Sequence, residues 1–370
     1  MTTAYSGDGI TFPDNSVQAT APRVGMVNRV INGGMVVDQR NAGAAVTTGT
    51  YVYGVDRFWL VNQTDGAFSI QQVTDAPTEF TNSLKVTVTT ADASLSSAQR
   101  FVINQGLEGF NMADLAYGTA NAKTVTLSFW VKSSVTGSYS VGLRAGDVVN
   151  GAAYVTSYVV NNANTWEYKT ITITGSTIGT WATTNACWAY LIFNLGIGSD
   201  FNITANTWVA GANGQGISSD TSLVGTNSAT WQITGVQLQK GSTATDFEYV
   251  DYGSQLQQCQ RYYYRNTNAN SSNNTSSFGF GVSVSTTRSD IQMTFPVTMR
   301  SSPTFNYGGS PIVTDSISYN LAVSSIASQY TNYQTARIFL NHASSATVRS
   351  PATLSAESGI NAYIELTAEL

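Results

Sequence analysis

Short stretches of alternating apolar and polar residues, separated by turns of Gly, Asn, Ser and Thr, run from residue 31 to residue 250 and most constrain the fold. About ten such stretches at regular spacing are typical of a β-sandwich. In the clearest, Val125, Leu127, Phe129 and Val131 share one face and Trp130 lies on the other, because side chains alternate across a strand. The predicted strands are DRFWLVN, FSIQQVT, SLKVTVTT, RFVINQGL, KTVTLSFWVKSS, SYSVGLRAG, AAYVTSYVVN, WEYKTITITG, CWAYLIFNLGIG and TWQITGVQLQ.

The segment 231–265 marks the end of this domain. Apolar residues from Trp231 to Leu238 predict a buried strand, followed by a turn at Lys-Gly-Ser. Leu256, Cys259 and Tyr263 then fall at roughly helical spacing in SQLQQCQRYYYR. This spacing predicts one short helix or an extended connector between two β domains.

The residues that follow predict a second, smaller β domain. A polar run, NTNANSSNNTSS, predicts a surface loop, and Ile291, Met293 and Phe295 alternate in the strand after it. ARIFLN and AYIELTAEL predict closing strands. Such short strands would leave edges and apolar faces open in an isolated monomer, so we expect a homotrimer that covers them.

Two segments resemble parts of tailed-phage tail fibres and receptor-binding proteins. GVQLQ-GSTAT-FE followed by LQQCQRYYYR resembles the module that joins a carbohydrate-binding-like jelly roll to a tip domain in that family. Residues 9–21, GITFPDNSVQATA, are similar to the FPDGTVQ-type segment near the start of many fibre subunits. Asn15 stands where Gly is usual, and Asn tolerates the positive φ of such a turn.

The resemblance implies an all-β chain with a jelly-roll sandwich, a short helical connector and a smaller C-terminal β-sandwich. It divides the chain into an attachment and trimerisation segment (1–30), the jelly roll (31–252), the connector (253–265) and a C-terminal β tip domain (266–370). It implies a homotrimeric fibre subunit on the virion exterior, joined to other virion proteins by its N-terminal segment and recognising a host-surface glycan. Two alternatives stay open: a virion structural protein such as a head fibre, decoration or tail-adaptor subunit, and a capsule or polysaccharide depolymerase.

The low charge of the chain excludes some partners. Charged residues make up 11% of the sequence and the net charge is −5, so the polar surface is mostly uncharged and carries no basic stripe for nucleic acid. The sequence shows neither a run of about 18 apolar residues nor a signal peptide, so we expect no membrane insertion and assembly in the host cytoplasm.

Side chains for catalysis are scarce, and we predict that the chain is not an enzyme. The single histidine, His342, is expected in a loop without a catalytic role, and no Gly-x-Ser-x-Gly, P-loop or HExxH motif occurs. Cys187 and Cys259 belong to no Cys/His cluster, which excludes a zinc site. We expect no cofactor; jelly-roll modules of this kind often hold a structural calcium, for which the sequence assigns no ligands.

Aromatic residues supply the candidate ligand contacts, because they stack on the CH groups of sugars. Trp181 and Trp208 lie in polar, loop-like segments and are predicted to face solvent. Tyr154 and Tyr158 share one face of a strand, where they line either a cleft or the core. We predict core packing for Trp59, Trp166, Trp188 and Trp231, and a second candidate surface at Tyr307, Tyr319, Tyr330 and Tyr333.

Overall fold

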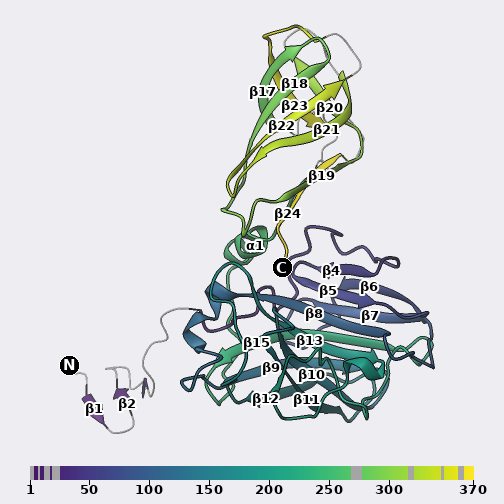
Figure 1. Ribbon diagram of the computed structural model, residues 1–370, viewed down its shortest axis with the longest axis vertical. Coiled ribbons are helices and arrows are strands. Elements are labelled where there is room, and N and C mark those ends of the chain that lie inside the picture. Colours follow the sequence, from purple (N-terminus) through teal and green to yellow (C-terminus); the bar gives the residue numbers. More distant parts are fainter. Residues whose placement is uncertain are drawn as a thin grey trace.

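The computed structural model describes residues 4–6, 9–11, 17–18, 26–267, 277–315, 321–342, 346–356 and 362–370 (Figure 1). Near the N-terminus, β1 (Ala4–Ser6), β2 (Gly9–Thr11) and β3 (Val17–Gln18) form a small antiparallel sheet. The turn predicted around Asn15, most of the polar run 266–277 and Tyr319 lie outside the described residues.

A sandwich of two antiparallel sheets forms the lower part of the molecule in Figure 1. The larger sheet has the order β14-β11-β10-β13-β8-β5-β4 and the smaller one the order β12-β9-β15-β7-β6. Their bounds are β4 (Tyr51–Val55), β5 (Phe58–Asn62), β6 (Ala67–Val73), β7 (Ser83–Thr90), β8 (Arg100–Glu108), β9 (Val125–Ser133), β10 (Gly137–Ala145), β11 (Ala152–Val160), β12 (Glu167–Ile173), β13 (Cys187–Ile197), β14 (Val209–Ala210) and β15 (Thr230–Lys240). Short 3₁₀ turns lie at η1 (Gly109–Asn111), η2 (Ala113–Leu115) and η3 (Ser199–Phe201).

The inner faces of the two sheets enclose one hydrophobic core. Phe129 of β9 packs against Phe193 of β13 with ring centroids 5.2 Å apart, and Phe193 also contacts Trp231 of β15. The alternation predicted for β9 is confirmed, because its four apolar residues are fully buried while Trp130 faces outward. Burial of each large side chain contributes roughly 1.5–3 kcal/mol, so this alternation determines which way each strand faces.

The connector contains one short helix, α1 (Tyr252–Gln260). The side chain of Asp251 caps it by accepting a hydrogen bond from the amide of Ser254 at 3.0 Å, and Cys259 is fully buried against the sandwich. The helix is shorter than the connector, because Tyr263 already begins β16 (Tyr263–Thr267), which pairs with β24 (Tyr363–Thr367).

The C-terminal domain confirms the all-β class but closes into a barrel instead of forming the expected sandwich. Its order is β17-β18-β22-β21-β20-β23, and β17 pairs with both β18 and β23. Closure leaves no barrel edge to be covered, so strand edges of the barrel no longer argue for a trimer. The strands are β17 (Ser277–Ser285), β18 (Arg288–Thr294), β20 (Pro311–Asp315), β21 (Leu321–Thr331), β22 (Thr335–His342) and β23 (Pro351–Ala356), with β19 (Thr304–Gly308) joining β24 and β16 in a separate sheet.

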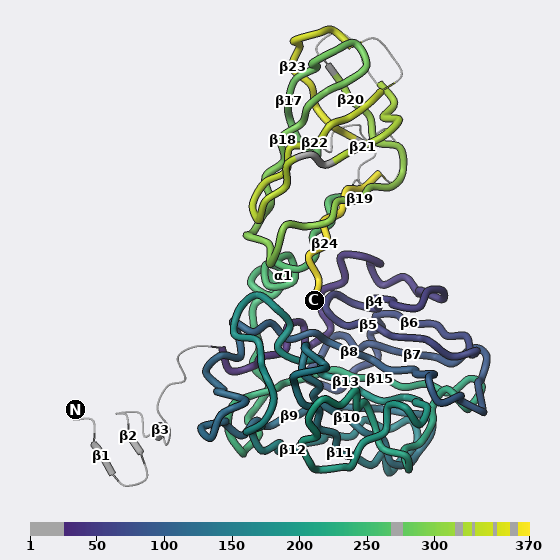
Figure 2. The backbone as a smooth tube through the Cα atoms, viewed as in Figure 1, coloured from purple at the N-terminus to yellow at the C-terminus, as the bar shows by residue number. Residues whose placement is uncertain are grey.

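The chain returns from the barrel to the sandwich, so that its C-terminal residues lie beside α1 (Figure 2). At this junction Glu108 of β8 is almost fully buried. Its carboxylate accepts hydrogen bonds from Arg261 at 2.5 and 2.9 Å and from the hydroxyl of Tyr262 at 2.5 Å. One carboxylate of the sandwich therefore holds the end of the connector.

A second buried carboxylate, Glu369, joins the residues after β24 to the sandwich. It forms ion pairs with Arg57 and with Arg40, the latter at 2.9 Å, and Arg40 also contacts Asp56 at 3.2 Å. Buried charges need such partners, because desolvation of an unpaired ion costs several kcal/mol. We call these residues the junction network: Arg40, Asp56, Arg57, Glu108, Arg261, Tyr262 and Glu369.

Candidate functional site

The four aromatic residues predicted to bind a ligand lie at or inside the core. Trp181 is only 8% exposed, so the prediction that it faces solvent is wrong. Its indole donates to the carbonyl of Ile178 at 2.9 Å, and its ring lies 4.8 to 5.4 Å from those of Tyr117, Trp188 and Trp208. Tyr117 and Trp208 come from distant segments, so the polar residues around Trp181 in the sequence gave no sign of its burial.

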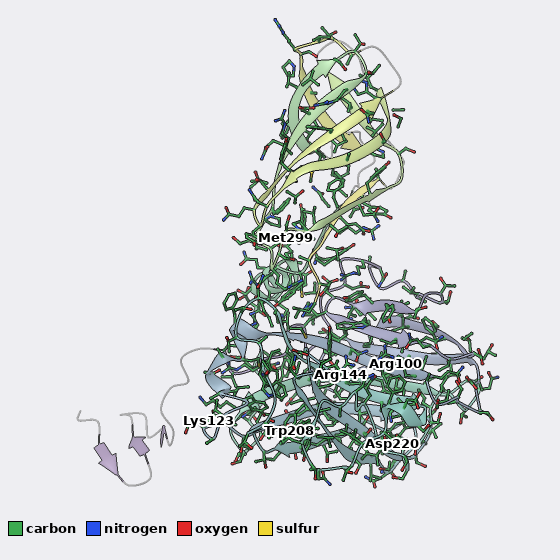
Figure 3. The ribbon with its side chains drawn as sticks, in the orientation of Figure 1. Arg100, Lys123, Arg144, Trp208, Asp220 and Met299 are labelled. Atoms are coloured by element: carbon green, nitrogen blue, oxygen red, sulfur yellow. The ribbon has the colours of Figure 1, made fainter. Side chains whose placement is uncertain are left out.

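Trp208, labelled in Figure 3, is half-buried. It donates to the carbonyl of Thr174 at 2.8 Å, and the Tyr154 ring lies 5.2 Å from its own. Tyr158 packs separately between Phe129 and Tyr139. The structure thus brings Trp181, Trp208 and Tyr154 together, but as packing at the core. Ligand binding by these residues stays a prediction, and better exposed aromatic side chains lie elsewhere.

Six aromatic side chains line a groove on the outer face of the five-stranded sheet. Trp130 of β9 and Tyr168 of β12 are paired across the two strands, with ring centroids 5.3 Å apart. Two adjoining hollows of about 770 and 460 Å³ share Trp130 and Glu79 in their lining. We call this surface the aromatic groove, lined by Phe80, Trp130, Trp166, Tyr168, Phe247 and Tyr249.

A loop after β15 forms one wall of the groove, and two buried glutamines of that strand hold it. Gln237 accepts a hydrogen bond from the amide of Glu248 at 2.8 Å. Gln239 donates to the carbonyl of Thr243 at 2.9 Å and accepts from the hydroxyl of Thr245 at 2.8 Å. The GVQLQ-GSTAT-FE motif therefore fixes the loop that carries Phe247 and Tyr249 over the sheet.

Gly235 allows the rings to approach the sheet. It lies in a β-bulge of β15 at φ 62°, where glycine is favoured. A Cβ atom at this position would meet Phe80 Cζ at 2.6 Å and Trp130 Cδ1 at 3.1 Å. The bulge and the missing side chain together leave room for the centre of the groove.

Polar groups hold and surround these rings. The Trp166 indole donates to Asp75 at 3.3 Å, and Lys132 and Gln232 donate to the same carboxylate at 2.5 and 3.1 Å. These hydrogen bonds, that from Lys132 above all, lower the pKa of Asp75. Trp166 is thus an outer-face residue, and its predicted core packing is wrong.

The start of β12 is fixed by Glu167. Its carboxylate accepts from the amides of Asn161 and Asn162 at 2.9 and 2.7 Å and from Lys169 at 2.6 Å. Burial opposes ionisation, but the Lys169 ammonium and these amides outweigh it and lower the pKa of Glu167 to about 2. Glu167 therefore stabilises the turn from which Trp166 and Tyr168 enter the sheet.

Sequence reasoning missed Phe80, Tyr168, Phe247 and Tyr249. A signal for Tyr168 was available, since Trp166, Tyr168 and Thr170 alternate with Ile171 and Ile173 in the manner of Trp130 and Phe129. For Phe247 and Tyr249 no local signal existed, because a loop's return over a sheet depends on the buried glutamines.

The single histidine does not line the aromatic groove. His342 is the last residue of β22 and buried, not in a loop, and its Nε2 lies 3.1 Å from the Ser289 hydroxyl. Within the described ranges, no group of three or more His, Cys, Asp or Glu side chains could hold a metal ion. None of the helices described is long and apolar enough to span a membrane.

Solved structures with a similar sandwich include bacteriophage and carbohydrate-binding proteins. The chain is similar to the enzymatically active domain of bacteriophage CBA120 tailspike protein 4 (15% identity, TM-score 0.29), over 58% of this chain and 22% of that one. It is also similar to a family 11 carbohydrate-binding module of Clostridium thermocellum, solved with a β-1,3-1,4-mixed-linked tetrasaccharide (13% identity, TM-score 0.28, 54% and 98% covered). A third is the CBM22-1 xylan-binding domain from Paenibacillus barcinonensis (9% identity, TM-score 0.27, 60% and 100% covered).

These scores are too low to assign a ligand or a site to this chain. No protein-family model matches the sequence, and a comparison with curated proteins found no match.

Proposed function

We propose that the chain is a glycan-binding subunit of a phage fibre and that it binds through the aromatic groove. The observation that carries this proposal is the set of partly exposed rings on one sheet face, with Tyr168 45% and Tyr249 61% exposed. Exposed rings on a rigid sheet can stack on sugar CH groups without a large loss of conformational entropy.

The edges of the groove supply hydrogen-bonding groups for sugar hydroxyls. Glu79 and Asp246 offer carboxylate oxygens, and Thr170 and Thr243 offer hydroxyls. Since Phe80, Trp130 and Phe247 line the same hollow as these groups, a pyranose ring lying on an aromatic face can reach polar partners at its edge. Binding of this kind is reversible and requires no catalytic side chain.

The virion assignment rests on the two sequence resemblances at 9–21 and 231–265. In this proposal a homotrimer is attached to other virion proteins by the N-terminal segment and displays the sandwich and barrel on the particle exterior. Weak individual sites would then gain avidity from the copies on each particle.

A glycan array with the purified chain tests the proposal, followed by calorimetry on the strongest ligand. Trp130→Ala and Tyr168→Ala should each weaken binding about 3- to 10-fold, the loss expected for an aromatic contact. Tyr330→Ala is the matched control, because this side chain is 66% exposed but lies on the barrel. Thermal melting of each variant separates a lost contact from a lost fold.

The outcomes separate the alternatives. Full affinity in both groove variants would exclude the groove, and a loss in Tyr330→Ala alone would move the site to the barrel. If the wild type binds no glycan, a structural virion role replaces adhesion. Shortened polysaccharide after incubation would instead identify a depolymerase.

A further inference from the structure

A second hollow lies on the opposite side of the sandwich, on the outer face of the seven-stranded sheet. It has a volume of about 390 Å³. We call it the arginine pocket, lined among others by Tyr51, Tyr53, Trp59, Arg100, Arg144 and Tyr190. Inner-face neighbours such as Phe58, Phe101 and Leu143 are fully buried in the core, so strand alternation places the lining residues outside it.

The strand register brings the lining residues together. Tyr53 pairs with Trp59 across β4 and β5, and Arg144 pairs with Tyr190 across β10 and β13. The Trp59 ring lies 5.5 Å from Tyr53 and 6.0 Å from Tyr190, and the Arg144 guanidinium lies 4.9 Å from the Tyr190 ring centroid. Three rings and one cation therefore form a continuous platform.

Arg100 and Arg144 have neutral partners only. Arg100 donates from Nε to Gln63 at 2.7 Å, and Arg144 donates from Nη1 to the side chain of Asn213. Neither has a carboxylate within 4.0 Å among the described residues, whereas six other arginines of the described chain form ion pairs: Arg29, Arg40, Arg57, Arg261, Arg288 and Arg337.

The pocket also contains a hydrogen-bond donor without a partner among the described residues. Arg144 Nε is buried and has no hydrogen-bond partner in the described part of the chain. Burial and, less strongly, the neighbouring charge of Arg100 lower the pKa of Arg144, which remains a cation because an arginine does not deprotonate in proteins. Two adjacent cations in a half-enclosed site favour an anion that both can contact.

We propose that the arginine pocket binds the anionic group of an acidic sugar, a carboxylate or a phosphate, while the sugar ring rests on the exposed Tyr51 and the half-buried Tyr53 and Tyr190, against which the buried Trp59 packs. The guanidinium groups of Arg100 and Arg144 donate paired hydrogen bonds to the anionic oxygens. This site is independent of the aromatic groove, which offers carboxylates in place of arginines. The chain then binds a neutral part of a surface glycan on one face and an acidic sugar on the other.

Calorimetry with three sets of probes tests this site: an oligohexuronate, a hexose phosphate and the neutral oligosaccharide of the same length. The wild type should bind at least one anionic probe more tightly than the neutral one, and binding should weaken as salt rises. Arg100→Gln and Arg144→Gln should each lower that affinity at least tenfold, the loss expected for a hydrogen bond to a charged group. Preference for the uronate or for the phosphate identifies the anion.

Lys123→Gln provides the matched control. It also removes one positive charge, but Lys123 is exposed and lies away from the two arginines (Figure 3). Equal affinity for neutral and anionic probes, no binding of any anionic probe, or the same loss in Lys123→Gln would overturn the proposal. Trp130→Ala should leave anionic-probe binding unchanged, so failure here and failure of the aromatic groove are distinguishable.

Discussion

The junction network and the arginine pocket contain the same residue types but use them differently. In both, a guanidinium lies over a tyrosine ring: Arg57 is 3.6 Å from the Tyr262 ring centroid, and Arg144 is 4.9 Å from that of Tyr190. At the junction, carboxylates complete each contact, and the side chains of Arg40 and Arg57 are only 13% and 1% exposed. In the pocket, neither Arg100 nor Arg144 has a carboxylate within 4.0 Å among the described residues, and both arginines line a hollow.

This difference shows how to tell a structural arginine from one available to a ligand. A buried cation must be paired within the protein, and in Arg40 and Arg57 this pairing occupies the Nη groups that an outside anion would need. A half-buried cation can keep water as its partner until an anion replaces it. The predictions below test this distinction, beginning with the largest expected effect.

Removing a carboxylate from the junction network should have the largest effect. Glu369→Ala leaves Arg40 and Arg57 without that partner, and an uncompensated buried charge costs about 3–5 kcal/mol. We expect a matching loss in the free energy of unfolding, measured by denaturant titration. Asp114→Ala breaks ion pairs whose carboxylate is 45% exposed and should cost at most about 1 kcal/mol. Equal losses in the two variants would refute the contrast.

A side chain at Gly235 should have the next largest effect. Gly235→Ala forces Phe80 and Trp130 away from the sheet and places a non-glycine residue at φ 62°, each of which costs about 1–3 kcal/mol. Glycan affinity should fall as well, because the two rings move. Gly43→Ala is the control, since Gly43 also has positive φ, lies outside the groove, and has only Gln72 Oε1 at 4.0 Å near its Cβ position. A comparable loss of affinity in the control would show that backbone strain, not crowding, is responsible.

Acid should weaken the groove side of the sandwich through Glu167. Its pKa is about 2 in the folded chain against 4.5 ordinarily, so its ionised form stabilises the fold above pH 4.5. This contribution should be lost progressively as pH falls from about 4.5 toward 2. Thermal melting across that range should show a smaller decline for Glu167→Gln than for the wild type. If the melting temperatures of Glu167→Gln and of the wild type fall equally as the pH is lowered, this role of Glu167 is ruled out.

Strand alternation made part of this architecture predictable. It correctly placed Phe129 inside and Trp130 outside, because one face of a sandwich strand must be buried. It could not show that Trp181 is covered by Tyr117 and Trp208, since those contacts join distant segments. The polar residues beside Trp181 therefore led to a wrong prediction of its exposure.

The two proposed binding surfaces depend on long-range strand pairing in the same way. Arg100 and Arg144 are 44 positions apart in the numbering, and only the order of β8, β13 and β10 brings them to one pocket. Barrel closure likewise rests on the pairing of β17 with β23, which local periodicity does not encode. The sequence did carry the glutamine motif at 236–239, whose function is clear only once the loop it holds is seen.

The smallest expected effect is the coupling between the two outer faces. If groove and pocket are separate sites, the affinity losses of Trp130→Ala and Arg144→Gln, measured on a glycan with both neutral and acidic residues, should add to within about 0.5 kcal/mol in the double variant. The two side chains lie on outer faces of different sheets, separated by the core, so they share no contact partner in the structure. A larger coupling would require that one ligand position depends on the other, as when a single glycan wraps around the sandwich edge. It would then be wrong to treat the faces as independent, although each could still bind sugar.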